Sequence, residues 1–142
     1  MTADTVKARL IGSWRLVSYE TEEPDGRRGR PYGDAIGRLS YDERGNMAGQ
    51  VMRPDRARVG FGDGSAQQVR AAYIGYVAYF GTYDVAADGS SLVHYVEGSL
   101  NPDWVGGAQR RALRFDGDRL ILSAEVRKHD AIVTHSLTWE RC

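Results

Sequence analysis

Gly12-Ser13-Trp14-Arg15-Leu16-Val17-Ser18-Tyr19 is the first of a series of short apolar runs that continues to the end of the chain. Trp, Val and Tyr are side chains that β-strands favour, and the run is shorter than a typical helix. Turn residues separate it from its successors, and the chain contains 17 glycines. Short runs between turn signals are typical of an all-β sandwich or barrel.

The whole series predicts eight antiparallel strands. They cover residues 14–19, 36–41, 47–52, 82–85, 92–100, 109–115, 120–126 and 132–139. Asp88-Gly89 and Asp116-Gly117-Asp118 are typical hairpin connections. Eight antiparallel strands close into a barrel that can hold one small ligand. The predicted fold class is therefore all-β, with a single eight-stranded antiparallel barrel.

Two segments depart from the β pattern. Apolar residues at helical spacing predict a helix over 65–80, inserted between the third and fourth strands: Val69, Tyr73, Tyr76, Val77 and Phe80. Ser65-Ala66-Gln67-Gln68 has the S-x-x-Q form of a capping box. We expect so aromatic a stripe to pack against the barrel. A short N-terminal helical turn is predicted over 6–10.

Composition narrows the class of protein. The 142 residues carry 19 Lys and Arg against 19 Asp and Glu, so the formal net charge is zero. This length predicts a single domain over 1–142, and balanced charge argues against a nucleic-acid partner. No apolar segment approaches the roughly 20 residues that span a bilayer, and no signal peptide is visible. We therefore expect a cytoplasmic protein without a membrane partner.

Several blocks of sequence, in order along the chain, resemble the bacterial and fungal lipocalin-like domain family. These blocks are residues 10–18, 52–56, 76–81, 94–100, 116–120 and 138–141, with Pro102 and Trp104. Gly12-Ser13-Trp14 resembles the G-x-W motif of lipocalins, whose Trp plugs the closed end of the barrel under an Arg that Arg141 would supply. The resemblance implies a small calycin-type barrel that holds a small organic molecule. Some members of the family that it resembles are found among enzymes of specialised metabolism.

His94 is the main acid–base candidate. In the strand over 92–100, alternation places Leu92, His94 and Val96 on one face and Glu97 on the other. If the first face points inward, the His94 imidazole enters the cavity, where it can exchange a proton near neutral pH. The alternatives are a hydrogen-bonded core histidine, or the opposite orientation, which would bring Glu97 into the cavity.

Arg111 is the second candidate catalytic residue. It shares a strand face with Leu113 and Phe115, which predicts that it points into the barrel. A buried guanidinium needs a partner, because an unpaired buried charge is unfavourable. That partner would be a bound carboxylate, enolate or phenolate, or alternatively Glu97 or Glu20 in a structural ion pair.

Further ligand contacts are expected from residues on the predicted inner faces and the barrel rim. Tyrosines in the cavity would provide rigid rings with a polar tip, although each would serve equally as barrel core. Trp104 follows Asn101-Pro102-Asp103 in a loop, where it would cover the barrel mouth or dock on the helix. The predicted ligand-binding residues are Ser18, Tyr41, Met52, Tyr83, Val96, Trp104, Leu122 and His135.

Two functions fit these features. One is a cofactor-independent cyclase or isomerase of specialised metabolism, in which His94 moves a proton and Arg111 stabilises negative charge on a carbonyl oxygen. The other is a non-catalytic carrier of a small hydrophobic, aromatic or polyketide-like ligand. A haem-binding barrel through His94 or His135 is a weaker alternative, and a barrel filled solid with side chains would indicate a structural module. No metal site or cofactor is expected, and the protein would be a monomer or a homodimer.

Overall fold

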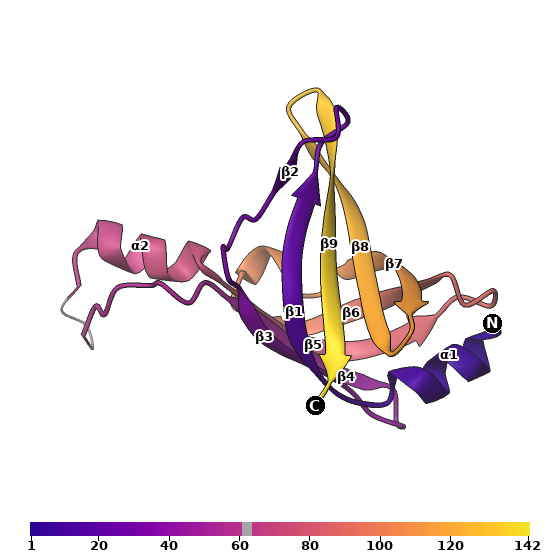
Figure 1. Cartoon of the computed structure of the whole chain (residues 1–142). Helices are drawn as coiled ribbons and strands as arrows, with labels where there is room; N and C mark the ends of the chain where they lie inside the picture. The colour runs from indigo at the N-terminus through magenta and orange to yellow at the C-terminus, as the bar shows by residue number, and fades with distance from the viewer. Residues whose placement is uncertain (61–63) are drawn as a thin grey trace.

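The computed structural model describes residues 1–60 and 64–142, and in them nine strands form one antiparallel sheet. The strands are β1 (Gly12–Glu22), β2 (Arg28–Gly29), β3 (Ile36–Tyr41), β4 (Asn46–Met52), β5 (Tyr76–Val85), β6 (Ser91–Ser99), β7 (Ala108–Asp116), β8 (Arg119–Lys128) and β9 (Ala131–Arg141). Their order is β2-β1-β3-β4-β5-β6-β7-β8-β9, and β1 also pairs with β9, which closes the sheet (Figure 1). The predicted eight-stranded antiparallel barrel is confirmed. The two-residue β2 is an additional strand beside β1, at Thr21 and Glu22.

Helix α1 (Ala3–Leu10) closes one end of the barrel. Its Val6 and Leu10 side chains are almost fully buried, and the Leu10 carbonyl accepts a 2.8 Å hydrogen bond from the Trp14 indole nitrogen. The Arg141 guanidinium lies 4.4 Å from the centre of the Trp14 ring and donates to the carbonyl oxygens of Ile11 and Arg9. This end is therefore sealed by contacts between both ends of the chain. The helix begins at Ala3, earlier than predicted.

Helix α2 (Ala66–Ile74) begins as predicted and ends earlier. The Ser65–Gln68 capping box is present, with hydrogen bonds of 3.2 and 2.9 Å. The predicted helical continuation to Phe80 is wrong, because residues from Tyr76 onward form β5. There the main chain pairs with β4 on one side and, from Tyr79 onward, with β6 on the other. These two ladders pair the backbone of the segment with its neighbours in the barrel wall, and this pairing overrides the helical spacing of the apolar residues.

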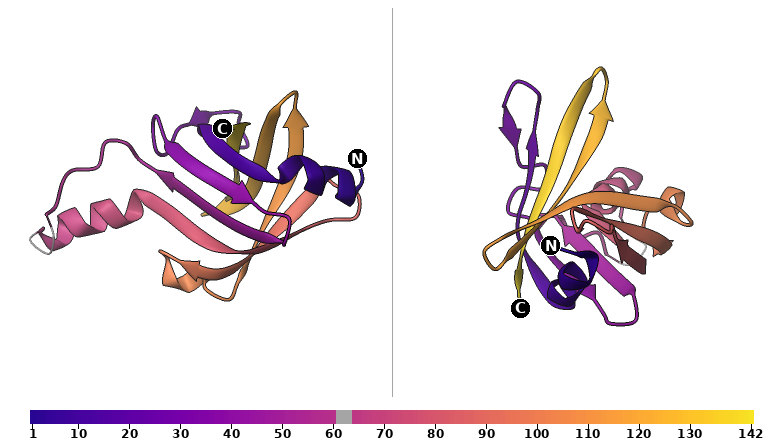
Figure 2. Two further views of the ribbon diagram at one scale, coloured as in Figure 1. Left: turned by 90° about the horizontal axis from the view of Figure 1, so that it is seen from below. Right: turned by 90° about the vertical axis from the view of Figure 1, so that its right-hand side faces the viewer.

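Helix α2 projects away from the barrel, as Figure 1 and the left view of Figure 2 show. None of its residues is buried, and Val69, Tyr73 and Ile74 are exposed, so the expected packing against the barrel is also wrong. With residues 76–80 in a strand, only Val69 and Tyr73 of the predicted apolar stripe remain in the helix. Hydrogen bonds anchor its C-terminal end: the Tyr32 hydroxyl donates to the Ile74 carbonyl, and the Arg56 guanidinium donates to the Ala72 carbonyl.

The barrel wall separates along two seams at the end opposite α1. The β1–β3 ladder stops at Arg15 and Arg38, and the β7–β8 ladder stops at Ala112 and Ser123. The β8–β9 ladder continues to the end of both strands. Strands β1, β8 and β9 therefore extend past the rest of the barrel as a blade, which forms the upper part of Figure 1.

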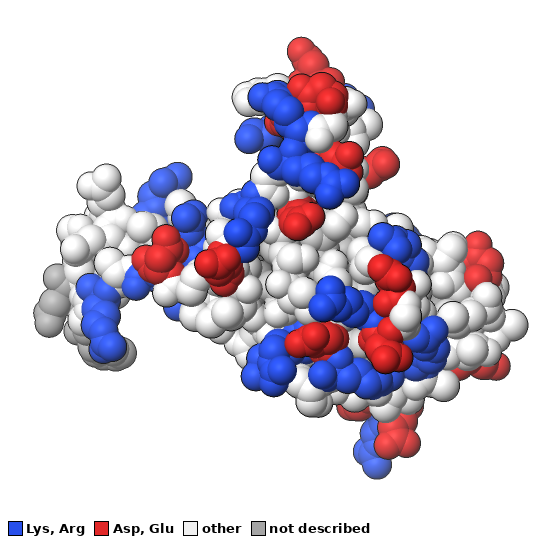
Figure 3. All heavy atoms as spheres, viewed as in Figure 1, with Lys and Arg blue, Asp and Glu red and all other residues white. Residues whose placement is uncertain are grey.

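Acidic and basic side chains are intermixed over the face seen in Figure 3, rather than forming a patch of one sign there. Exposed ion pairs such as Lys7–Asp84 and Arg30–Asp34 contribute to this mixture. Neither α1 nor α2, the α-helices of the described residues, is long and apolar enough to cross a membrane.

Candidate functional site in the barrel cavity

A cavity of about 450 Å³ lies inside the barrel, and we call it the inner cavity. Much of its wall is apolar: Leu39, Met47, Val51, Val77, Leu122, Leu137 and Trp139. Polar side chains line the rest of the same space: Tyr19, Gln50, Tyr79, His94, Gln109, Arg110, Arg111, Glu125 and His135. A mostly apolar wall with a few polar groups is typical of small-molecule sites. The barrel is thus hollow rather than filled solid.

His94 lies on the inward face of β6. Its side chain is 2% exposed, between the buried Leu92 and Val96, whereas Glu97 is exposed on the outer face. Of the two orientations open from the sequence, the structure therefore has the one that brings His94 to the cavity. Its hydrogen-bond partners are Tyr79 on the neighbouring strand β5 and Tyr41 on β3, which is not adjacent to β6 in the sheet.

Both ring nitrogens of His94 are engaged by tyrosine hydroxyls. The Tyr41 hydroxyl lies 2.7 Å from Nε2, and the Tyr79 hydroxyl lies 2.7 Å from Nδ1. Burial, together with the positive charge of Arg111, lowers the pKa of His94 from 6.5 to about 3. The imidazole is therefore neutral at pH 7. We call this series the Tyr41–His94–Tyr79 chain.

The hydrogen bonds of the Tyr41–His94–Tyr79 chain limit how His94 could act on a ligand. With both nitrogens hydrogen-bonded, neither is available to touch a substrate or to ligate a haem iron. A proton could pass between His94 and a cavity ligand only through Tyr79, because Tyr79 lines the cavity and Tyr41 is enclosed. The acid–base role predicted for His94 therefore depends on Tyr79, which lies within the helix predicted from the sequence over 65–80.

A second tyrosine–histidine pair lies on the blade. The Tyr19 hydroxyl of β1 is 2.7 Å from Nδ1 of His135 on β9, and both residues line the inner cavity. Burial raises the pKa of Tyr19 to about 12, and burial also lowers the pKa of His135. At neutral pH the pair is therefore uncharged and acts as a polar contact.

Arg111 brings a positive charge to the cavity. Its guanidinium donates to the Arg110 carbonyl at 2.8 Å and to the Gln109 side-chain oxygen at 3.2 Å. Among the described residues it makes no ion pair with a carboxylate within 4.0 Å, and neither Glu97 nor Glu20 serves as its partner. Its charge reaches both histidines, since it lowers the pKa of His94 and of His135. The structural ion pair considered from the sequence is thus not formed.

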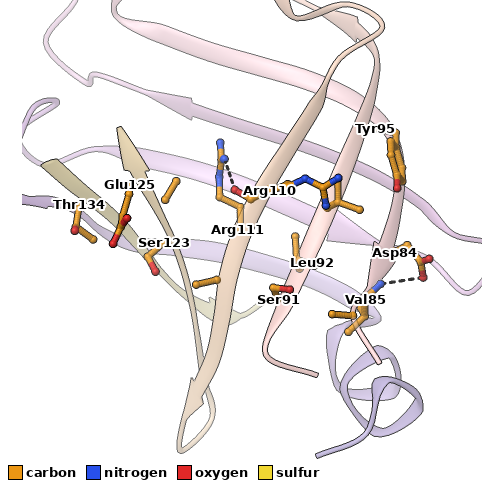
Figure 4. Close-up of a pocket in the computed structure, with 14 residues that line it drawn as sticks. Asp84, Val85, Ser91, Leu92, Tyr95, Arg110, Arg111, Ser123, Glu125 and Thr134 are labelled. Carbon is orange, nitrogen blue, oxygen red and sulfur yellow. Dashed lines mark hydrogen bonds between the residues drawn. The ribbon is translucent and has the colours of Figure 1, made fainter. Parts of the chain in front are cut away.

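The β7–β8 seam connects the inner cavity with a groove of about 580 Å³, which we call the outer groove (Figure 4). Arg110, Arg111, Ala124 and Glu125 line both spaces. Figure 4 shows Arg110 and Arg111 leaving β7 in different directions, with Glu125 on the neighbouring strand. Arg111 therefore stands at the boundary between the cavity and the outside.

Five of the ten predicted site residues line the inner cavity: His94, Trp104, Arg111, Leu122 and His135. Trp104 ends the short 3-10 helix η1 (Pro102–Trp104), and its ring packs edge-on against Tyr79 with 6.1 Å between ring centres. It therefore covers the Tyr41–His94–Tyr79 chain rather than docking on α2.

The other five predicted residues lie outside the cavity lining: Ser18, Tyr41, Met52, Tyr83 and Val96. A β-bulge between Leu16 and Ser18 reverses the alternation of β1, so that Tyr19 takes the inward place. Tyr41 lies behind His94, and the Tyr83 hydroxyl donates to the Asp42 carbonyl in the turn after β3.

Met52 and Val96 have other contacts. The Met52 sulfur accepts a 3.1 Å hydrogen bond from the Arg56 guanidinium, next to the anchored end of α2. Val96 is buried, and its main chain pairs with Gly106 and Gly107 in the loop after η1. Tyr19 and Tyr79 line the cavity but were not among the residues predicted from the sequence. No signal in the sequence marks the bulge, and the apolar spacing placed Tyr79 in a helix.

Comparison with known proteins identifies the family of the chain. Residues 11–142 match the family model described as a lipocalin-like domain. The chain is similar to the 4'-hydroxy-3'-methoxypropiophenone carrier protein of Aspergillus oryzae (strain ATCC 42149 / RIB 40). The two are 35% identical over 86 residues, which cover 54% of this chain and 78% of that protein. The hollow barrel and the carrier relative both support a ligand-binding role. Because the family model spans nearly all of the chain, this protein belongs to the lipocalin-like domain family.

Proposed function

We propose that this protein binds and carries a small aromatic ligand that bears a carbonyl or phenolic oxygen. The observation that carries the proposal is Arg111, a guanidinium without a carboxylate partner among the described residues, at the edge of an otherwise largely apolar cavity. An apolar wall selects the ring of such a ligand, and a charged donor selects its oxygen. The name of the fungal relative, which specifies an aryl ketone, supports the same class of ligand.

Titration with 4'-hydroxy-3'-methoxypropiophenone tests this proposal. Trp104 and Trp139 line the inner cavity, whereas Trp14 lies at the sealed end, so binding should change the intrinsic tryptophan fluorescence. We expect saturable binding, and Arg111→Met should weaken it roughly tenfold or more, because a hydrogen bond from a charged donor is lost.

Arg114→Met is the matched control for this titration. Arg114 is an exposed arginine on the same strand and lines neither the inner cavity nor the outer groove. Its substitution should leave the dissociation constant unchanged. Equal affinities of the Arg111→Met and Arg114→Met variants would contradict the role given to Arg111, and absence of saturable binding would contradict the proposed function.

The Tyr41–His94–Tyr79 chain favours a second candidate function, a cofactor-independent cyclase or isomerase. In that reaction a proton would pass between the substrate and His94 through the Tyr79 hydroxyl. Arg111 would stabilise negative charge developing on a carbonyl oxygen. His94→Gln should then abolish turnover of an identified substrate and still permit product binding, whereas a carrier would show only a changed affinity. Full turnover by His94→Gln would exclude the acid–base role.

A further inference from the structure

The Tyr41–His94–Tyr79 chain has a direction that follows from counting its hydrogens. A neutral imidazole has one N–H donor and one bare nitrogen acceptor. The two tyrosine hydroxyls, each 2.7 Å from a ring nitrogen, must therefore play opposite parts. One hydroxyl donates to the bare nitrogen, and the other accepts from the N–H and keeps its own hydrogen for another acceptor.

Tyr41 is the hydroxyl with nowhere else to donate. Its side chain is 2% exposed, and within the described residues its hydroxyl meets only His94. The ring of Tyr83 packs edge-on against it at 4.7 Å, and the Tyr83 hydroxyl is already used on the Asp42 carbonyl. If Tyr41 accepted from His94, its own hydrogen would be buried without a partner, which is unfavourable. Tyr41 therefore donates to Nε2.

The rest of the direction follows. With Nε2 as the acceptor, His94 carries its hydrogen on Nδ1 and donates it to the Tyr79 oxygen. The Tyr79 hydrogen is then left over at a side chain that lines the inner cavity. We propose that Tyr79 donates this hydrogen to a carbonyl oxygen of the bound ligand, and that Tyr41 and His94 are positioning residues that fix the direction.

The ionisation of these groups is consistent with that direction. Burial raises the pKa of Tyr41 and of Tyr79, and it lowers the pKa of His94. Arg111 on β7 is the charged group that faces them, and it opposes ionisation of the histidine. All three members of the chain therefore stay uncharged at neutral pH, with Tyr79 as a phenol that can donate.

The inference deepens the proposed function, on which it rests, by specifying the chemistry at one end of the ligand. Arg111 can only donate, and the direction of the chain makes Tyr79 a donor as well. This end of the cavity therefore takes an acceptor oxygen such as a ketone or its enolate, and gives no advantage to an aromatic molecule that lacks one.

The tautomer of His94 tests the direction without any ligand. Long-range ¹H–¹⁵N correlation spectra of the wild-type protein at pH 7, after resonance assignment, identify which ring nitrogen carries the hydrogen. We expect it on Nδ1. A hydrogen on Nε2 would overturn the proposal, because Tyr79 would then be donating to the histidine.

Binding measurements test the ligand contact. Para-hydroxyacetophenone and para-ethylphenol differ by the carbonyl oxygen, so the ratio of their dissociation constants reports contacts to that oxygen. In the wild-type protein the ketone should bind more tightly, and Tyr79→Phe should reduce this preference roughly three- to tenfold. Tyr83→Phe is the control, since Tyr83 is on the same strand but its hydroxyl donates to the Asp42 carbonyl and neither residue lines the cavity.

The outcomes separate the two proposals. An unchanged preference in Tyr79→Phe would overturn the contact to Tyr79, although binding itself would still support the proposed function. If the wild-type protein bound neither compound, the proposed function and the ligand contact would both fail, and the tautomer would still decide the direction of the chain. A loss of preference in Tyr83→Phe equal to that in Tyr79→Phe would also count against the contact.

Discussion

Mild acid should destabilise this protein through His94. The imidazole is buried and neutral in the folded state, with a pKa of about 3, whereas in the unfolded chain its pKa is close to 6.5. As the pH falls below 6.5, the unfolded state takes up a proton that the folded state does not. The free energy of unfolding therefore falls as the pH falls through this range, because the unfolded state binds more protons.

The size of the effect follows from the two pKa values. Each pH unit between them changes the free energy of unfolding by about 1.4 kcal/mol. Between pH 7 and about pH 4.5 the loss from His94 is about 2–3 kcal/mol. The carboxyl groups of Asp25, Asp42, Asp84 and Asp88 have pKa values lowered from 3.8, so their own contributions are lost mainly at still lower pH. The loss of stability between pH 7 and about pH 4.5 therefore reports mainly on histidine.

Urea unfolding of the wild type and of His94→Gln at both pH values measures this loss. The variant lacks the titrating group, so its free energy of unfolding should fall by about 2–3 kcal/mol less than that of the wild type. His135 contributes with the same sign, because burial lowers its pKa too, but it is present in both proteins and cancels in the comparison. The same pH dependence in both proteins would refute the neutral, buried His94.

Three other substitutions test the fold. Ser65→Ala removes the capping box of an unpacked helix, so amide exchange in α2 should become faster while the urea midpoint of the whole protein stays the same. Arg141→Lys loses the forked donation at the sealed end and the stacking on Trp14, and should lower the free energy of unfolding by about 1–2 kcal/mol in urea titrations. Gly81→Ala would force a Cβ atom into the Tyr95 carbonyl oxygen, so about 2–3 kcal/mol should be lost in thermal or urea unfolding; a wild-type midpoint would contradict the close approach of β5 and β6.

The sequence predicted most of the fold because short β-type runs and turn residues are local signals. The eight barrel strands and the Ser65 cap were found in this way. The end of α2 was not, because Tyr76, Val77 and Phe80 fit a helical spacing and a strand equally well. Pairing with two neighbouring strands decides between them, and partners so distant in the chain are not visible in a local pattern.

The site was predictable only where alternation was regular. β6 is regular from Leu92 to Val96, so His94 and its inward face followed from the sequence. In β1 the bulge before Ser18 reversed the alternation and brought Tyr19 into the cavity instead. The hydrogen-bond partners of His94 are on two other strands, β3 and β5, so the spacing of residues within one strand does not reveal them.

The central claim is that the inner cavity is the ligand site, and a crystal structure with para-hydroxyacetophenone tests it most directly. We expect the aromatic ring in the inner cavity, with its ketone oxygen within hydrogen-bonding distance of the Tyr79 hydroxyl and facing Arg111. A ligand held only in the outer groove, or one whose ketone oxygen points away from both donors, would contradict it.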